Sequence, residues 1–117
     1  MCGFVGFTGQ LAQGESVLKN MMDAIIHRGP DSAGTHVDEN ISLGFRRLSI
    51  IDLDSGTQPM YNETGDIVIV FNGEIYNYQE LREELIQKGH VFKYNADTEV
   101  LVHGYEEFGE DMLNRLR

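Results

Sequence analysis

Strand-like and helix-like segments alternate along these 117 residues over short connections, and this alternation limits the folds open to the chain. Short apolar runs predict strands over residues 3–8, 41–48, 67–72 and 91–94. Helical periodicity predicts helices over residues 16–27 and 78–88, a third from about residue 97, and a further segment over 110–117. The interleaved order predicts layers of helices and strands.

The ends of two predicted helices carry specific signals. The first helix should end at the His-Arg-Gly-Pro-Asp stretch of residues 27–31, because glycine and proline together stop a helix. Asn77 and Glu80 resemble a capping box at the start of the second helix, and Gly89 occupies the position of a C-terminal cap.

Apolar spacing also predicts which faces are buried. Strand 67–72 is almost continuously apolar and should be buried. The first helix should present Val17, Met21, Ala24 and Ile25 on one face. The third should bury Val100, Leu101, Tyr105 and Phe108.

Acidic residues outnumber basic ones 19 to 9, which gives a formal net charge of -10. A surface this negative repels phosphate backbones and anionic lipids, so we expect neither nucleic-acid nor membrane binding. No apolar run is long enough to span a bilayer and no leader pattern precedes the first strand, which predicts a cytoplasmic protein. The single cysteine excludes an internal disulfide, and the four histidines are not at ligand spacing with it, so we expect no metal site.

Cys2 stands out because of its position. Methionine before a small residue is commonly removed after synthesis, which would leave Cys2 with a free α-amine. That amine titrates at about 7.7–8.0 and can accept the thiol proton, directly or through water, so one residue would supply both nucleophile and base. Gly3 and Gly6 would let a substrate approach the backbone closely. The alternative is a small buried cysteine at a frayed terminus.

Asn72 and Gly73 could supply the hydrogen-bond donors that acyl transfer requires. The side-chain amide of Asn72 and the backbone N–H of Gly73 follow a predicted buried strand, where they could stabilise an oxyanion. The alternative is a simple turn, since Asn-Gly is the commonest hairpin signal. A helix rather than an alternating strand follows within five residues, which favours a site.

A pocket for a zwitterionic amino-acid substrate would need a cation for the substrate carboxylate and an anion for its ammonium. An arginine can bind a carboxylate with two parallel hydrogen bonds, and Arg46 and Arg47 end a predicted strand. Asp97, assisted by Glu74, could bind the ammonium. Each has a structural alternative, because the arginines could be solvated strand-end charges and Asp97 could be a helix N-cap.

Five segments together resemble class II glutamine amidotransferases, most closely the glutaminase domain of glutamine-hydrolysing asparagine synthetases. They are Met-Cys-Gly-Phe-Val-Gly at the start, His-Arg-Gly-Pro-Asp-Ser-Ala-Gly at 27–34, Arg-Leu-Ser-Ile-Ile at 47–51, Asn-Gly-Glu-Ile-Tyr-Asn at 72–77 and Ala-Asp-Thr-Glu at 96–99. They occur in the family's order and cover nearly the whole chain. Pro30 and the Asn-Gly-Glu-Ile-Tyr-Asn-Tyr stretch resemble the asparagine-synthetase form. Cys2 disfavours β-lactam synthetases, which look similar but lack the cysteine.

The resemblance implies an α+β fold of the N-terminal nucleophile hydrolase type, an αββα sandwich, and a role for each matching residue. Cys2 would be nucleophile and base, with Asn72 and Gly73 as oxyanion hole. Arg47, preferred over Arg46, would bind the glutamine carboxylate and Asp97 its ammonium. The expected pocket lining and supporting residues are Glu74, Leu48, Ser49, Ile50 and Ile51, with Arg28 and Asn77 near the nucleophile.

Complete members of this family are longer than 117 residues. They continue through more strands and an ATP-using synthetase domain, so residues 1–117 are expected to be the first part of a glutaminase domain, truncated after the third or fourth helix. The glutaminase step needs no cofactor, and ATP and Mg²⁺ belong only to the missing synthetase domain. Uncovered apolar faces favour self-association into a homo-oligomer.

Three functions therefore stay open for the chain. The first is hydrolysis of glutamine to glutamate through a Cys2 thioester, with the ammonia used to amidate aspartate in the full-length enzyme. The second is a non-catalytic glutamine-binding or self-associating module. The third is an N-terminal nucleophile amidohydrolase that acts on another amide.

Overall fold

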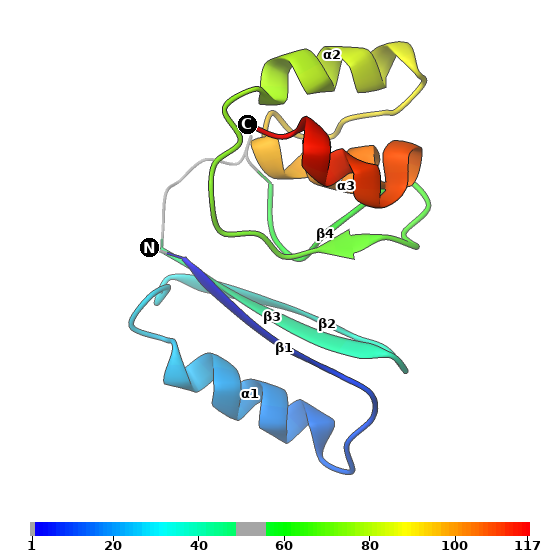
Figure 1. Ribbon diagram of the computed structural model, residues 1–117. Helices are drawn as coiled ribbons and strands as arrows, with labels where there is room; N and C mark the ends of the chain where they lie inside the picture. Colours follow the sequence, from blue (N-terminus) through cyan, green and yellow to red (C-terminus); the bar gives the residue numbers. More distant parts are fainter. Residues whose placement is uncertain (1, 49–55) are drawn as a thin grey trace. The chain divides into compact units, whose positions relative to one another are not determined.

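The computed structural model describes residues 2–48 and 56–117, which group into two units along the chain. The described part of the first unit comprises residues 2–48, 57–59 and 70–72. The second comprises residues 56, 60–69 and 73–117. In Figure 1 the first unit carries helix α1 (Gly14–Ala24), and the second carries α2 (Tyr78–Gln87) and α3 (Asp97–Phe108).

The first unit is built on a three-stranded antiparallel sheet with the strand order β1-β3-β2. Its strands are β1 (Gly3–Thr8), β2 (Ser32–Val37) and β3 (Ile41–Arg47). Helix α1 lies across one face of this sheet (Figure 1) and buries Leu18 and Met22. Gly44 of β3 permits this contact, because a Cβ there would lie 2.6 Å from the Met22 sulfur.

The predicted first helix was wrong at both ends and in its buried face, as helix α1 shows. It begins at Gly14, before residue 16, and ends at Ala24 rather than at residue 27. Leu18 and Met22 form the buried face, one position along from the predicted set. The helix ends early because the next backbone amides bond in short turns, for example Arg28 N–H to the Ile25 carbonyl at 2.9 Å.

Strand β2 was not predicted. Its sequence, Ser-Ala-Gly-Thr-His-Val, has no apolar alternation, and four of its six residues are exposed. The strand forms because it pairs along its whole length with β3. Between them, the Asp38 side chain accepts hydrogen bonds from the amides of Asn40 and Ile41 at 2.7 and 2.9 Å, which closes the hairpin.

The second unit packs α2, α3 and the 3₁₀ helix η2 (Gly109–Arg115) around a small apolar core. Leu81, Leu85, Val100 and Met112 form this core. Helix α3 also contacts the short strands β4 (Met60–Tyr61) and β5 (Val68–Ile69). The prediction of α3 was largely right, but Tyr105 is half exposed rather than buried.

The predictions of a buried strand over residues 67–72 and of a helix over residues 110–117 were both wrong in part. Only residues 68–69 pair as a strand, and their side chains are partly rather than fully buried. The last segment is a 3₁₀ helix over residues 109–115, which buries Met112 alone.

Residues 91–94 form no strand, contrary to the prediction, because carboxylates occupy their backbone amides. The Glu99 side chain accepts hydrogen bonds from the amides of Lys93 and Tyr94 at 2.7 and 2.8 Å. Glu63 accepts from the amide of Val91 at 2.9 Å. These amides are therefore unavailable for a sheet ladder.

Glu99 is a buried charge with a full set of partners. Burial raises the pKa of its carboxyl, but hydrogen bonds from His103, Lys93 and Tyr94 outweigh this effect and lower the pKa below its usual range. The ionised side chain thereby fixes the connection into α3.

The start of α2 differs from the predicted capping box, although its position is confirmed. Asn77 makes no side-chain cap hydrogen bond to the helix. Its amide donates instead to the Arg115 carbonyl at 2.7 Å and accepts from the Arg117 amide at 2.8 Å. Gly89 has a φ of 100°, as expected for a glycine just past a helix end.

The element content agrees with the predicted α+β class. The described residues form three α-helices and two antiparallel sheets, which is compatible with an N-terminal nucleophile type of fold. No helix among them is long and apolar enough to cross a membrane.

Candidate functional site

Cys2 immediately precedes β1 in the first unit, and its backbone carbonyl accepts two side-chain hydrogen bonds. Arg28 Nε donates from 3.2 Å and Asn72 Nδ2 from 2.9 Å. The residue is partly buried and its thiol is free. Two segments far along the chain thus fix the position of residue 2.

Arg28 reaches Cys2 because the next residue is a glycine pressed against β3. A Cβ at Gly29 would lie 2.5 Å from the Arg47 nitrogen, too close for any other residue without a backbone shift. The Asp31 amide then donates to the Arg47 carbonyl at 3.1 Å. The Arg-Gly-Pro-Asp sequence therefore has a structural role, which is to dock this loop on the end of β3 and direct Arg28 at the N-terminus.

Asn72 is positioned through Gln58, a residue that the sequence analysis did not single out. Gln58 Oε1 accepts a hydrogen bond from the Phe71 amide at 2.6 Å. The Gln58 carbonyl in turn packs directly over Gly34 of β2, where a Cβ would clash with it. A polar side chain beside a proline, in a loop between apolar runs, was the available signal for this support.

Arg46 and Arg47 differ in their surroundings. Arg46 donates from Nε to the Met22 carbonyl at 3.3 Å and from its guanidinium to Asp23 at 3.2 Å, so it is bound to α1. Successive side chains of a strand point to opposite faces, which puts Arg47 on the face away from α1. Cys2 precedes Gly3, the partner of Arg46 in the ladder, so the same alternation assigns Cys2 to the face of Arg47.

The candidate residues Gly73, Glu74 and Asp97 lie in the second unit. Asp97 is the first residue of α3 and follows the N-cap Ala96, so the N-cap alternative is wrong. Its carboxylate accepts a hydrogen bond from the Ile75 amide at 3.0 Å, which holds the segment after Gly73 and Glu74. Glu74 is exposed.

The remaining predicted residues take other positions or lie outside the described part of the chain. Asn77 binds the backbone of Arg115 and Arg117 within the second unit. Leu48 is 44% exposed at the end of β3. Ser49, Ile50 and Ile51 lie outside the described residues.

Two hollows of the first unit, of about 470 and 480 Å³, adjoin α1. Neither is lined by Cys2, Arg28, Arg47 or Asn72. Neither hollow is lined by a thiol, so the nucleophile chemistry of the chain points to Cys2 rather than to these hollows.

A family model described as glutamine amidotransferase domain matches residues 1–117, the whole chain.

The chain belongs to the glutamine amidotransferase domain family.

This amidotransferase domain is similar to several asparagine synthetases described as glutamine-hydrolyzing. It is 50% identical to asparagine synthetase 1 of Bacillus subtilis (strain 168), over 100% of this chain and 19% of the relative. It is 48% identical to asparagine synthetase 2 of the same organism, over 93% of this chain and 15% of the relative. It is 42% identical to the asparagine synthetase of Zea mays, over 99% of this chain and 20% of the relative. The chain thus spans about a fifth of the length of these curated relatives.

Proposed function

We propose that this amidotransferase domain carries out the glutaminase half-reaction of a glutamine-hydrolysing asparagine synthetase. The observation that carries the proposal is the pair of hydrogen bonds from Arg28 and Asn72 to the Cys2 carbonyl, which fix a candidate nucleophile beside an amide donor. The family match and the printed names of the relatives support the same reaction.

In the proposed first step, the Cys2 thiol attacks the side-chain amide carbon of glutamine. The α-amine of Cys2 takes the thiol proton, a C–S bond forms, and the carbonyl π electrons move to oxygen. Asn72 has two amide hydrogens, one of which bonds to the Cys2 carbonyl, so the other can donate to this oxyanion. Collapse breaks the C–N bond, and the proton on the α-amine leaves with the nitrogen as ammonia.

In the second step, water hydrolyses the resulting γ-glutamyl thioester. The α-amine accepts a proton from the water, the C–S bond breaks, and the thiol is restored as glutamate leaves. Atoms and electrons balance without a cofactor. In a full-length enzyme the ammonia would amidate aspartate, a reaction that requires ATP and Mg²⁺ in a domain beyond these residues.

Substrate selection is proposed to depend on charge. Arg47 would bind the glutamine carboxylate, because a guanidinium matches a carboxylate with two parallel hydrogen bonds. Three further roles are proposed from the motifs that carry the residues. Gly73 would be the second oxyanion donor, and Asp97 would bind the substrate ammonium with help from Glu74. Self-association and a cytoplasmic location also stay predictions.

An electrophilic glutamine analogue tests the function directly. Incubation with the purified chain should add one analogue mass per chain, because Cys2 is the sole cysteine and its thiol would attack the reactive carbon. Intact-mass spectrometry followed by peptide mapping measures the adduct and its position.

The matched controls are the Cys2→Ser chain, which should stay unmodified, and excess glutamine, which should slow labelling. A native chain that a general thiol reagent modifies but the analogue does not would favour the non-catalytic module. Hydrolysis of simple amides as fast as glutamine would favour the general amidohydrolase.

Replacing Arg47 with alanine should raise the KM for glutamine roughly 10- to 100-fold, as expected for loss of a charged hydrogen bond worth about 1.5–3 kcal/mol. The value of kcat should change less, because the contact is present in both ground and transition states. Steady-state glutamate release measures both constants. Arg46→Ala is the control, since Arg46 is bound to α1, and a larger KM effect there would contradict the assignment.

A further inference from the structure

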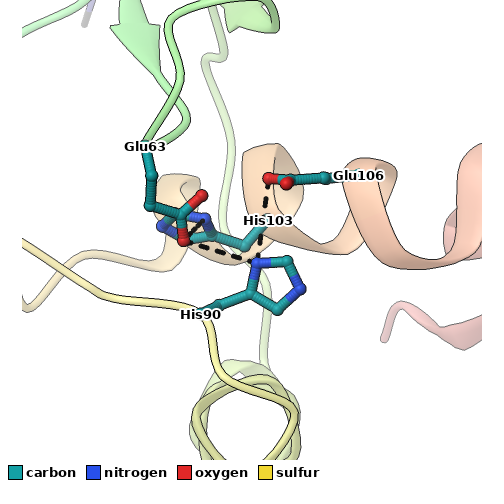
Figure 2. Close-up of side chains that lie close together, drawn as sticks. All are labelled: Glu63, His90, His103 and Glu106. Carbon is teal, nitrogen blue, oxygen red and sulfur yellow. Dashed lines mark ion pairs between the residues drawn. The ribbon is translucent and has the colours of Figure 1, made fainter.

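Four side chains of the second unit converge at a place that the proposed glutaminase reaction does not use (Figure 2). Glu63 comes from the turn between β4 and β5, and His90 from the segment after α2. His103 and Glu106 lie one turn apart on α3. One nitrogen or oxygen of each side chain lies within 4.8 Å of those of the other three.

The closest spacings match the edges of a tetrahedral metal site. Glu63 Oε1 lies 3.1 Å from His103 Nδ1 and 3.4 Å from His90 Nδ1. His90 Nδ1 lies 3.8 Å from Glu106 Oε2. In a tetrahedron with zinc–ligand distances near 2.0–2.1 Å, neighbouring donor atoms are about 3.3 Å apart.

Both imidazoles are oriented by a carboxylate on their outer nitrogen. His103 Nε2 lies 3.1 Å from Glu99 Oε1, and His90 Nε2 lies 2.8 Å from Glu107 Oε2. An ionised carboxylate only accepts hydrogen bonds, so each Nε2 carries a hydrogen, and in the neutral ring each Nδ1 presents a lone pair to the cluster. This carboxylate–histidine arrangement is the usual outer support of a metal-binding histidine.

The ligating carboxylates are supported in the same way. Asn62 donates to Glu106 Oε2 at 3.0 Å, and the Val91 amide donates to Glu63 Oε1 at 2.9 Å. Each carboxylate is thus held by a hydrogen bond from a neutral donor, as metal-ligating carboxylates commonly are.

The buried Nδ1 of His103 is an independent indication of a cation site. The His103 side chain is 1% exposed, and its Nδ1 has no hydrogen-bond partner within the described part of the chain. The Glu63 oxygen faces this nitrogen at 3.1 Å without hydrogen-bond geometry. Two lone pairs at that distance repel each other unless a positive charge lies between them.

The negative charge around the cluster also favours binding of a cation. Four carboxylates, those of Glu63, Glu99, Glu106 and Glu107, surround the two imidazoles. Lys88 lies 4.0 Å from Glu107 at the periphery. The cluster therefore stays net negative even when both imidazoles are protonated, and a divalent ion would compensate it.

We propose that Glu63, His90, His103 and Glu106 bind one divalent transition-metal ion of the zinc type. Two imidazole nitrogens favour such an ion over magnesium or calcium, which prefer oxygen ligands alone. Four protein ligands make a closed, structural site, which ties the β4–β5 turn and the segment after α2 to helix α3. This proposal departs from the sequence expectation of no metal site. The histidine and glutamate three residues apart on α3 were the available signal.

Titration of the purified chain with Zn²⁺ should give one tight site per chain, measured by calorimetry and by metal analysis after gel filtration. Glu63→Gln and His90→Ala should each weaken binding by more than about 100-fold, because changes to outer-sphere partners alone cost about 10–100-fold. Glu107→Ala, which removes such a partner, should fall within that smaller range. Zn²⁺ should also raise the melting temperature of the native chain but not of Glu63→Gln.

Two matched controls locate the ion. Cys2→Ser removes the other strong zinc ligand of the chain, and His27→Ala removes an exposed imidazole outside the cluster, so both should bind zinc like the native chain. A Co²⁺ complex of the native chain should show the intense visible absorption of a tetrahedral site, a readout that requires no variant. The proposal is overturned by absence of stoichiometric binding, by unchanged binding in Glu63→Gln and His90→Ala, by loss in Cys2→Ser, or by a weak octahedral cobalt spectrum.

Discussion

Replacing Cys2 with alanine should lower glutamate release from glutamine by on the order of 10⁴-fold or more, because removal of a catalytic nucleophile eliminates the covalent route. No other thiol can substitute, since the chain has one cysteine. Glutamine binding should persist in the variant, because its charged contacts are assigned to other side chains. Coupled detection of glutamate measures turnover, and calorimetry measures binding.

Two preparations make this result interpretable. Circular dichroism should be the same for the native and Cys2→Ala chains, since the two contacts to residue 2 use its backbone carbonyl and not its sulfur. Cys2→Ser keeps a weaker nucleophile of similar shape. Glutaminase activity that survives in a clean Cys2→Ala preparation would refute the nucleophile assignment.

Replacing Asn72 with alanine should lower kcat by on the order of 10²–10³-fold, the usual cost of removing one oxyanion donor. KM should change little, because the donor acts on charge that develops only in the transition state. The rate of thioester formation, measured by rapid quench and intact mass, should fall by the same factor as kcat.

Asn72 also holds the Cys2 carbonyl, so a second variant must separate positioning from oxyanion stabilisation. Arg28→Ala removes the other hydrogen bond to that carbonyl without touching an oxyanion donor. It should therefore cost clearly less in kcat than Asn72→Ala. Equal losses in the two variants would mean that Asn72 acts only by positioning residue 2.

Sequence patterns predicted the elements whose own residues determine them. Strand β1, helix α2 and helix α3 agree closely with the predicted ranges, because each carries its apolar spacing or its helix-ending glycine locally. Strand β2 could not be predicted, since its six residues lack apolar alternation and are ordered by β3.

Residues 91–94 show the opposite error. Val-Phe-Lys-Tyr has the alternation of a strand, but the side chains of Glu63 and Glu99 take its backbone amides. Those carboxylates come from residues outside the segment, so no local pattern could reveal them. The same long-range pairing explains why Asn77, which resembles a cap in the sequence, binds the last residues of the chain.

The candidate site was predictable as a set of residue types but not as a set of contacts. Cys2, Arg28 and Asn72 were all named from the sequence. No sequence pattern, however, could show that Arg28 and Asn72 both donate to the backbone carbonyl of Cys2. Gln58 was missed for a related reason, because its role depends on meeting the Phe71 amide across an intervening stretch of chain.

The hydrogen bonds to the Cys2 carbonyl also have a practical consequence for how the protein should be produced. They do not involve the amine of residue 2, so a purification tag fused ahead of that residue would leave the anchoring intact. In such a preparation the backbone nitrogen of Cys2 would be an amide nitrogen, which cannot act as a base. Tags should therefore be attached at the other end, and an inactive N-terminally tagged sample says nothing about the enzyme.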